Sequence, residues 1–453
     1  MVRSSRLRKA LRTGGLMGIC AVAGGALFNV SALSQTSRRP ARPPAAMRQA
    51  EALVREGRQT FRFDDFGDFK FWGGALQLHK AIEGAGHGGV GPGVSPKTAL
   101  AVGLKVDVNA LPRSVRSALK AGKVNLNSPA TTLALLKLNA VVGVKGHFNR
   151  SGTLSSIGLT CAVCHSTVNN SFAPGIGRRL DGWPNRDLNV GAIVSLAPNL
   201  KPVTDLLGVD AATVKKVLAA WGPGKFDAEL FLDGKGFRPD GKTAATLIPP
   251  AYGLAGVNLH TYTGWGSIPY WNAFVANLEM HGQGDFTDVR LDDANKFPIA
   301  ARNRMGHTRV HGVPDRIRKK LPALHAYQLS LAAPRPPSRS FNHAAARRGK
   351  AIFDGKGRCA SCHLPPTYSE PGWNLHAPAE ICTDAFQAER SPTNAYRTTP
   401  LGGLGTRATQ KGGFYHDGRF ATLGQVVQHY NSCFGLGLTA SEQSDLVEYL
   451  KSL

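Results

Sequence analysis

The fold of this chain is decided by two short stretches, Cys161-Ala-Val-Cys-His165 and Cys359-Ala-Ser-Cys-His363. In each, two cysteines stand three positions apart and a histidine follows the second one directly. With 7 cysteines and 14 histidines in 453 residues, chance produces roughly 0.003 such runs. A zinc site or a thioredoxin-type redox pair is the alternative, but neither requires the adjacent histidine twice.

A Cys-x-x-Cys-His run is the attachment signature of a c-type haem. The two thiols can each reach a vinyl group of one haem, and the histidine that follows turns its imidazole onto the iron. The sequence therefore predicts two covalently bound haem c groups. The attachment residues are Cys161, Cys164, Cys359 and Cys362, and the iron ligands are His165 and His363.

The N-terminal residues have the composition of an export signal. Five cations within residues 3–12 precede the apolar run 14–28, and the small residues Ser31 and Ala32 follow. We therefore expect a cleaved signal peptide over residues 1–34 and a periplasmic protein, with an uncleaved anchor as the alternative. No two adjacent arginines precede the apolar run, so the Sec route is favoured over the twin-arginine route.

The charge of the chain favours acidic partners. Its formal net charge is +25 at pH 7, and loss of the five signal-peptide cations leaves +20. Basic residues form no recognisable nucleic-acid module, so we expect no nucleic-acid partner. A basic surface can instead steer an acidic redox partner or hold the protein near an anionic envelope surface. With 42% hydrophobic and 19% charged residues, the composition is that of a globular protein.

Two cysteines outside the signal peptide and the two motifs remain, Cys382 and Cys433. In an oxidising periplasm they are a candidate disulfide, and two buried free thiols are the alternative.

Two matching helix endings indicate a tandem. The expected helix 316–331 ends Tyr327-Gln-Leu-Ser-Leu331, and the chain ends Tyr449-Leu-Lys-Ser-Leu453. Each ending follows one Cys-x-x-Cys-His run, at 166 positions after the first histidine and 90 after the second, so the first unit is enlarged by 76 residues. Helices are also expected over residues 342–353 and 439–453.

We therefore predict a mainly α fold of two tandem cytochrome c-type haem domains, with an enlarged first unit and long irregular loops. The Pro-rich segment 332–339 marks the boundary between them. The expected parts are an N-terminal region packing on the first haem (35–144), a first haem domain with an insertion (145–331), the linker (332–339) and a second haem domain (340–453).

The second haem lacks a methionine from its own unit, because the last methionine is Met305. Electron carriers of this type usually add methionine as the second axial ligand, which raises the reduction potential. The other candidates in this unit are His376, His416, His429, Tyr415 and Tyr430.

Bacterial di-haem cytochrome c peroxidases have a closing motif that resembles Gly413-Phe-Tyr-His-Asp-Gly-Arg-Phe-Ala-Thr-Leu423 with Val426-Val-Gln-His-Tyr-Asn431 behind it. That family includes the MauG-type enzymes and is distantly similar to di-haem rubber oxygenases. The resemblance covers residues 340–453 closely and 151–331 loosely.

The resemblance implies roles for individual residues. Tyr430 falls where the MauG-type enzymes have a tyrosine ligand of the second iron, and His416 falls in a His-Asp-Gly loop that lies beside the haems. A Trp-led segment of the family ends in an acid-base glutamate at the open haem. Here the segment starting at Trp265 ends Glu279-Met-His-Gly282, which makes Glu279 the catalytic candidate; an ordinary glutamate on a helix surface is the alternative.

The family often also holds calcium between its domains. Candidate acids in this chain have no dedicated loop spacing, so solvated turn residues are the alternative. These acids are Asp181, Asp187, Asp285, Asp288, Asp292 and Asp293.

The expected function is a di-haem oxidoreductase that reduces hydrogen peroxide, or uses peroxide or dioxygen for an oxidation, at the haem of His165. The second haem would be the electron-transfer centre, supplied by a small redox protein or a quinol-linked donor. The alternative is a non-catalytic periplasmic di-haem electron carrier. The enzyme is favoured by the missing methionine, the enlarged first unit and the His-Asp-Gly motif.

Overall fold

The computed structural model describes residues 44–453. The predicted signal peptide, residues 1–34, lies outside the described residues. Within 44–453 every helix is too short or too polar to traverse a bilayer. The contacts join Ala45–Leu453 into a single unit.

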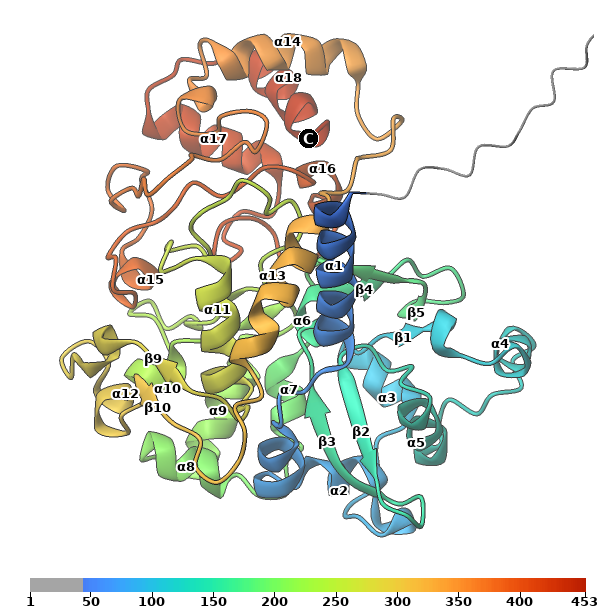
Figure 1. The fold of residues 1–453 in the computed structure, drawn as a ribbon. Coiled ribbons are helices and arrows are strands. Elements are labelled where there is room, and N and C mark those ends of the chain that lie inside the picture. The colour runs from blue at the N-terminus through green and yellow to red at the C-terminus, as the bar shows by residue number, and fades with distance from the viewer. Residues whose placement is uncertain (1–43) are drawn as a thin grey trace, which may run out of the picture. The chain divides into compact units, whose positions relative to one another are not determined.

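Helices make up most of the regular structure (Figure 1). They are α1 (Ala45–Phe63), α2 (Leu78–Glu83), α3 (Pro96–Ala101), α4 (Arg113–Lys120), α5 (Pro129–Lys137), α6 (Ala162–His165), α7 (Val190–Val194), α8 (Lys201–Leu207), α9 (Ala211–Trp221), α10 (Leu230–Asp233), α11 (Ile268–Phe274), α12 (Pro298–Arg302), α13 (Leu321–Ser330), α14 (His343–Asp354), α15 (Phe386–Glu389), α16 (Leu404–Arg407), α17 (Leu423–Cys433) and α18 (Ala440–Lys451).

The strands are short and pair in twos. They are β1 (Val106–Asp107), β2 (Val144–Phe148), β3 (Leu154–Leu159), β4 (Ser166–Val168), β5 (Ile176–Gly177), β6 (Arg179–Asp181), β7 (Lys225–Phe226), β8 (Thr246–Leu247), β9 (Phe286–Thr287) and β10 (His307–Thr308). Only the antiparallel hairpin β2–β3 exceeds three residues per strand. The prediction of a mainly α chain is confirmed at this level, and the division into two haem domains stays a prediction.

The predicted closing helices are α13 and α18. Helix α18 begins with a capping box, in which the Thr439 hydroxyl accepts from the Glu442 N–H and the Glu442 carboxylate accepts from the Thr439 N–H. Its partner α14 begins at Asn342, whose side chain accepts hydrogen bonds from two backbone N–H groups of the first turn. The expected helices therefore form, with ends within a few residues of those predicted.

Two helix pairs are built in the same way. Gly57 of α1 lies against the backbone of α13, where an added Cβ would stand 1.8 Å from the Ala323 carbonyl oxygen. Gly349 of α14 lies against α18 likewise, with 2.0 Å to the Asp445 carbonyl oxygen. Figure 1 shows α1 alongside α13 and α14 crossing α18.

The aromatic contacts repeat as well. Phe61, four residues after Gly57, meets the ring of Tyr327 edge-on at 5.5 Å, and Phe353, four residues after Gly349, meets Tyr449 at 5.1 Å. Helix α1, in the segment predicted as a separate N-terminal region, is therefore the counterpart of α14. Residues 64–160 lie between that helix and the first Cys-x-x-Cys-His run.

Substituting Gly349 by alanine should destabilise the protein by about 1–3 kcal/mol, because the new methyl group overlaps the α18 backbone and the two helices must separate. Urea unfolding followed by circular dichroism measures the change. Gly424→Ala in α17 is the matched control: its nearest neighbour would be Thr422 Oγ1 at 3.7 Å, and alanine favours a helix by up to about 1 kcal/mol over glycine. Equal stability of the two variants would contradict the close crossing.

Cys382 and Cys433 form a disulfide, with their Cα atoms 6.0 Å apart. The predicted pairing is confirmed. It fastens the end of α17 to the loop that precedes α15, and it spans 51 positions of the chain. A cross-link over such a loop stabilises a fold mainly by restricting the unfolded chain.

Candidate active site between the first Cys-x-x-Cys-His motif and Glu279

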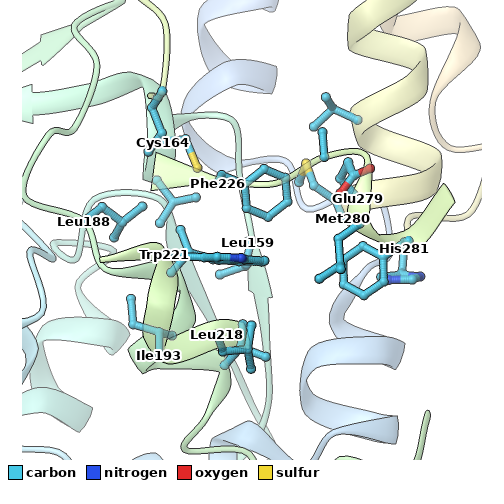
Figure 2. A pocket seen from close by; sticks show the side chains of 18 of the residues that line it. Leu159, Cys164, Leu188, Ile193, Leu218, Trp221, Phe226, Glu279, Met280 and His281 are labelled. Atoms are coloured by element: carbon cyan, nitrogen blue, oxygen red, sulfur yellow. The ribbon is translucent and has the colours of Figure 1, made fainter. Parts of the chain in front are cut away.

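A cavity of about 350 Å³ opens beside the first motif, within the range of small-molecule sites. Most of its walls are apolar side chains. Figure 2 shows Cys164, Leu188 and Trp221 on one side and Glu279 and His281 on the other. The first motif and the predicted catalytic glutamate therefore face the same space.

The first motif forms one helical turn. Positions i, i+3 and i+4 of a helix share a face, so Cys161, Cys164 and His165 point the same way. His165 Nδ1 lies 3.1 Å from the Pro249 carbonyl oxygen and donates to it, which leaves Nε2 as the basic nitrogen. Burial lowers the pKa of His165 to about 4, so the ring is neutral and able to bind a metal.

The second motif repeats this arrangement. His363 N–H donates to the Cys359 carbonyl at 2.9 Å, which closes a helical turn. The ring Nδ1 lies 2.9 Å from the Tyr368 carbonyl oxygen and donates to it, again leaving Nε2 for a metal. Burial lowers the pKa of His363.

The motif thiols are also suited to a covalent cofactor. All four are free of disulfide bonds. Burial raises the pKa of Cys161 and Cys164 to about 12, so both are neutral thiols in this structure. Free thiols beside a neutral, oriented histidine and a large apolar cavity fit a c-type haem.

Glu279 ends the π-helical turn Val275–Glu279, which continues α11. Its side chain is buried, with 6% exposure of the residue, and neither carboxyl oxygen has a hydrogen-bond partner among residues 44–453. Burial, followed by the nearby carboxylates of Glu229 and Asp227, raises the pKa of Glu279 well above its usual range. The alternative of an ordinary glutamate on a helix surface is therefore wrong, and Glu279 is a neutral acid that faces the cavity.

A second carboxyl group in the cavity wall escapes sequence reasoning. Glu229 is buried, and burial raises its pKa to about 7, against the opposing effect of Arg390. Arg390, which is fully buried, pairs with Asp227 at 2.9 Å and with Asp233 at 2.7 Å. No local sequence pattern predicts that these acids surround Arg390, because the acids and the arginine come from two segments more than a hundred residues apart.

His281 is a further residue in the wall of the cavity. Its ring stacks on Phe71 with 3.6 Å between centroids, and burial lowers its pKa to about 4. The stretch Glu279-Met-His-Gly282 contains this histidine. Its position two residues after the candidate acid could therefore have indicated from sequence that His281 belongs to the site.

Tyr430 lies close to the second motif. Burial is the main cause that raises the pKa of Tyr430, and the neighbouring Cys359 and Cys362 raise it further. Its ring lies parallel to Phe434 at 5.6 Å. The adjacent His429 lies edge-on to Tyr415 at 5.5 Å.

His376, another candidate ligand of the second iron, is engaged elsewhere. Its Nε2 lies 2.5 Å from Glu370 and its Nδ1 lies 2.8 Å from Glu380. Both ring nitrogens are thus bonded to carboxylates, and the His376 ring, Glu370 and Cys362 have their potential ligand atoms within 4.8 Å of one another.

His416 lies between the two motif regions. Its buried ring stacks on Tyr396 at 5.1 Å and lies 6.2 Å from Tyr262, which lines the cavity. Its Nε2 is 3.5 Å from Asp384, and its carbonyl accepts a 2.7 Å hydrogen bond from Leu247 N–H. This position accords with a residue that supports the site without binding iron, which stays a prediction.

The six aspartates predicted as possible calcium ligands do not form a cluster. Asp181, Asp187, Asp285 and Asp288 each pair with a cationic side chain, Asp292 pairs with His307, and Asp293 accepts from the backbone N–H groups of Asn295 and Lys296. In the described part of the chain, none of these six belongs to a cluster with metal-ligating distances.

No protein-family model matches the chain. The cytochrome-c peroxidase IdrP1 of Denitromonas iodatirespirans is 26% identical in an alignment of 246 residues, and the match covers 41% of this chain and 64% of that protein. The match thus spans less than two thirds of the relative.

Two solved structures also align in part. A MauG-like protein associated with microbial copper homeostasis is 17% identical, with a TM-score of 0.31 over 50% of this chain and 79% of that one. The diheme peroxidase BthA from Burkholderia thailandensis is 18% identical, with a TM-score of 0.30 over 52% and 78%. Scores this low carry no argument about the fold. The relative from Denitromonas is a cytochrome-c peroxidase by name, and it confirms the resemblance to cytochrome c peroxidases seen in the motifs.

Proposed function

We propose that this chain is an exported di-haem c-type cytochrome that reduces hydrogen peroxide, or uses peroxide or dioxygen for an oxidation, in the cavity beside His165. The observation that carries the proposal is Glu279, a buried and unpartnered carboxyl group facing the same cavity as the first motif. A protein that only carries electrons has no use for such a group, because its burial costs free energy without a compensating bond.

The cysteines and histidines of the two motifs have separate roles in binding the haems. Cys161 and Cys164 hold the first haem, and Cys359 and Cys362 the second; the haems supply redox-active iron. His165 and His363 bind iron through Nε2, oriented by their hydrogen bonds to backbone carbonyls.

Glu279 transfers the protons that peroxide reduction requires. Reducing one peroxide to two waters takes two electrons and two protons, so a group within reach of the peroxide must move protons between its oxygens and from solvent. As a neutral acid, Glu279 can donate first and be recharged through its neighbour Glu229, whose pKa lies at about 7. The apolar walls exclude bulk water from the reacting atoms.

Cys359, Cys362 and His363 would hold a haem that supplies electron-transfer chemistry. Tyr430 is the proposed second ligand of its iron; tyrosinate favours the ferric state and lowers the potential. The electrons would come from a small redox protein or a quinol-linked donor in the periplasm, drawn by the basic charge of the chain.

Rapid mixing with hydrogen peroxide tests the proposal. The purified, haem-loaded protein, in its ferric and in its half-reduced form, should change its haem absorbance within milliseconds to seconds. The change should be confined to one of the two haems, since the cavity beside the first motif holds the acid Glu279. Absence of any reaction in both forms would replace this function by that of a periplasmic electron carrier.

A further inference from the structure

Three arginines near the two motifs lack the acidic partners that buried arginines need. Arg186 is buried with 8% exposure, and its Nε and one terminal nitrogen have no hydrogen-bond partner among residues 44–453. Arg397 and Arg407 are half-buried, and each has one buried side-chain nitrogen in the same condition. No ion pair within the described residues involves any of the three.

Their positions follow from the chain around the first motif. Arg186 belongs to the loop in which Asn185 N–H donates to the Cys164 carbonyl at 2.8 Å. Arg397 donates from its backbone to Tyr262 at 3.0 Å and from its side chain to the Thr261 carbonyl, and both of these residues line the cavity. The two arginines therefore lie next to residues of the first site, although they are far apart in the sequence.

Arg407 faces the second motif. It ends α16, whose Leu404 packs in the same apolar cluster as Cys359, and it donates to the Pro400 carbonyl at 3.0 Å. It also acts on Arg186 and Arg397, whose own pKa values it lowers after the larger effect of burial. The three cations are therefore close enough to repel one another.

Such a group is costly without counter-charges. Removing a charge from water costs several kcal/mol unless a partner of opposite sign is supplied. Elsewhere the fold supplies that partner: Arg390 has Asp227 and Asp233, and Arg179 has Asp107 at 3.2 Å. Among residues 44–453 no carboxylate pairs with the three arginines, and an anionic group from outside the polypeptide would supply the missing charge.

We propose that Arg186, Arg397 and Arg407 bind the propionate carboxylates of the two haems and so hold the haems' acidic edges toward each other. A guanidinium group donates charge-assisted hydrogen bonds to a carboxylate, and this would use the unpartnered nitrogens. Cations at the propionates also disfavour the ferric state, which carries one more positive charge, so they raise the reduction potential of the iron. The inference rests on the proposed attachment of two haems but not on peroxide chemistry.

Redox titration of the purified holoprotein, followed by absorbance, tests the arginines. Arg407→Gln should lower the potential of the second haem, and Arg397→Gln that of the first. The expected change in the ferrous-to-ferric ratio is tenfold or more, equivalent to 59 mV for a one-electron couple. Arg407→Lys keeps the charge and should restore most of the shift. Arg113→Gln removes an exposed cation of α4 and is the matched control.

Mass measurement of each variant separates the possible failures. Thioether bonds keep the haems attached when a propionate contact is lost, so all variants should carry two haems. A wild-type protein without haem would overturn the proposed function together with this inference. Two haems with potentials that move no more than in Arg113→Gln would overturn the inference alone.

Discussion

Glu279→Gln should slow the reaction of the protein with hydrogen peroxide by about a hundredfold or more, the usual loss when a general acid-base group is removed. Glutamine keeps the size and the hydrogen-bonding shape of the side chain but cannot transfer a proton. Because Glu279 already stands as a neutral acid, the substitution leaves the charge of the cavity unchanged at neutral pH. Stopped-flow absorbance in the haem region measures the rate.

Glu83→Gln is the matched control for this experiment. Glu83 is also buried, at 4% exposure, and burial also raises its pKa, but it lies at the end of α2 and outside the cavity. Its substitution should leave the peroxide rate unchanged. If both variants react as fast as the wild type, proton transfer in this cavity does not depend on Glu279.

The second prediction with a large expected effect is the covalent attachment of two haems. The denatured protein should exceed the mass of its mature polypeptide by two haems, because thioether bonds survive unfolding. Replacing Cys161 and Cys164 by serine should remove one haem, and replacing Cys359 and Cys362 should remove the other. Mass spectrometry of the intact variants measures both losses.

Two controls sharpen this prediction. Serine at Cys382 and Cys433 should leave both haems in place, since that pair is joined in a disulfide. Tyr430→Phe should also keep both haems but change the absorbance spectrum of one, through loss of the proposed iron ligand. If His429→Ala changes that spectrum instead, the ligand is the neighbouring residue. A wild-type mass equal to the bare polypeptide would contradict covalent attachment.

Short-range features were within reach of the sequence. Attachment of a c-type haem needs residues at i, i+3 and i+4 of one turn, so the motif at Cys161 and the one at Cys359 can be recognised without any tertiary structure. The closing helices α13 and α18 were predictable for the same reason, because their matching endings are short local patterns. The disulfide followed from compartment and elimination, since only Cys382 and Cys433 remained to pair.

The tertiary structure alone decided which distant groups meet. Gly57 and Phe61 have the spacing of Gly349 and Phe353, but their relation became visible only when both helix pairs were seen to cross at a glycine. The burial of Glu279 could not be read from its own turn, because the residues that exclude water from it belong to other segments. The same holds for the three unpartnered arginines. The sequence does not reveal whether an arginine side chain is surrounded by solvent, by a carboxylate or by apolar groups, because its surroundings are determined by packing across the whole chain.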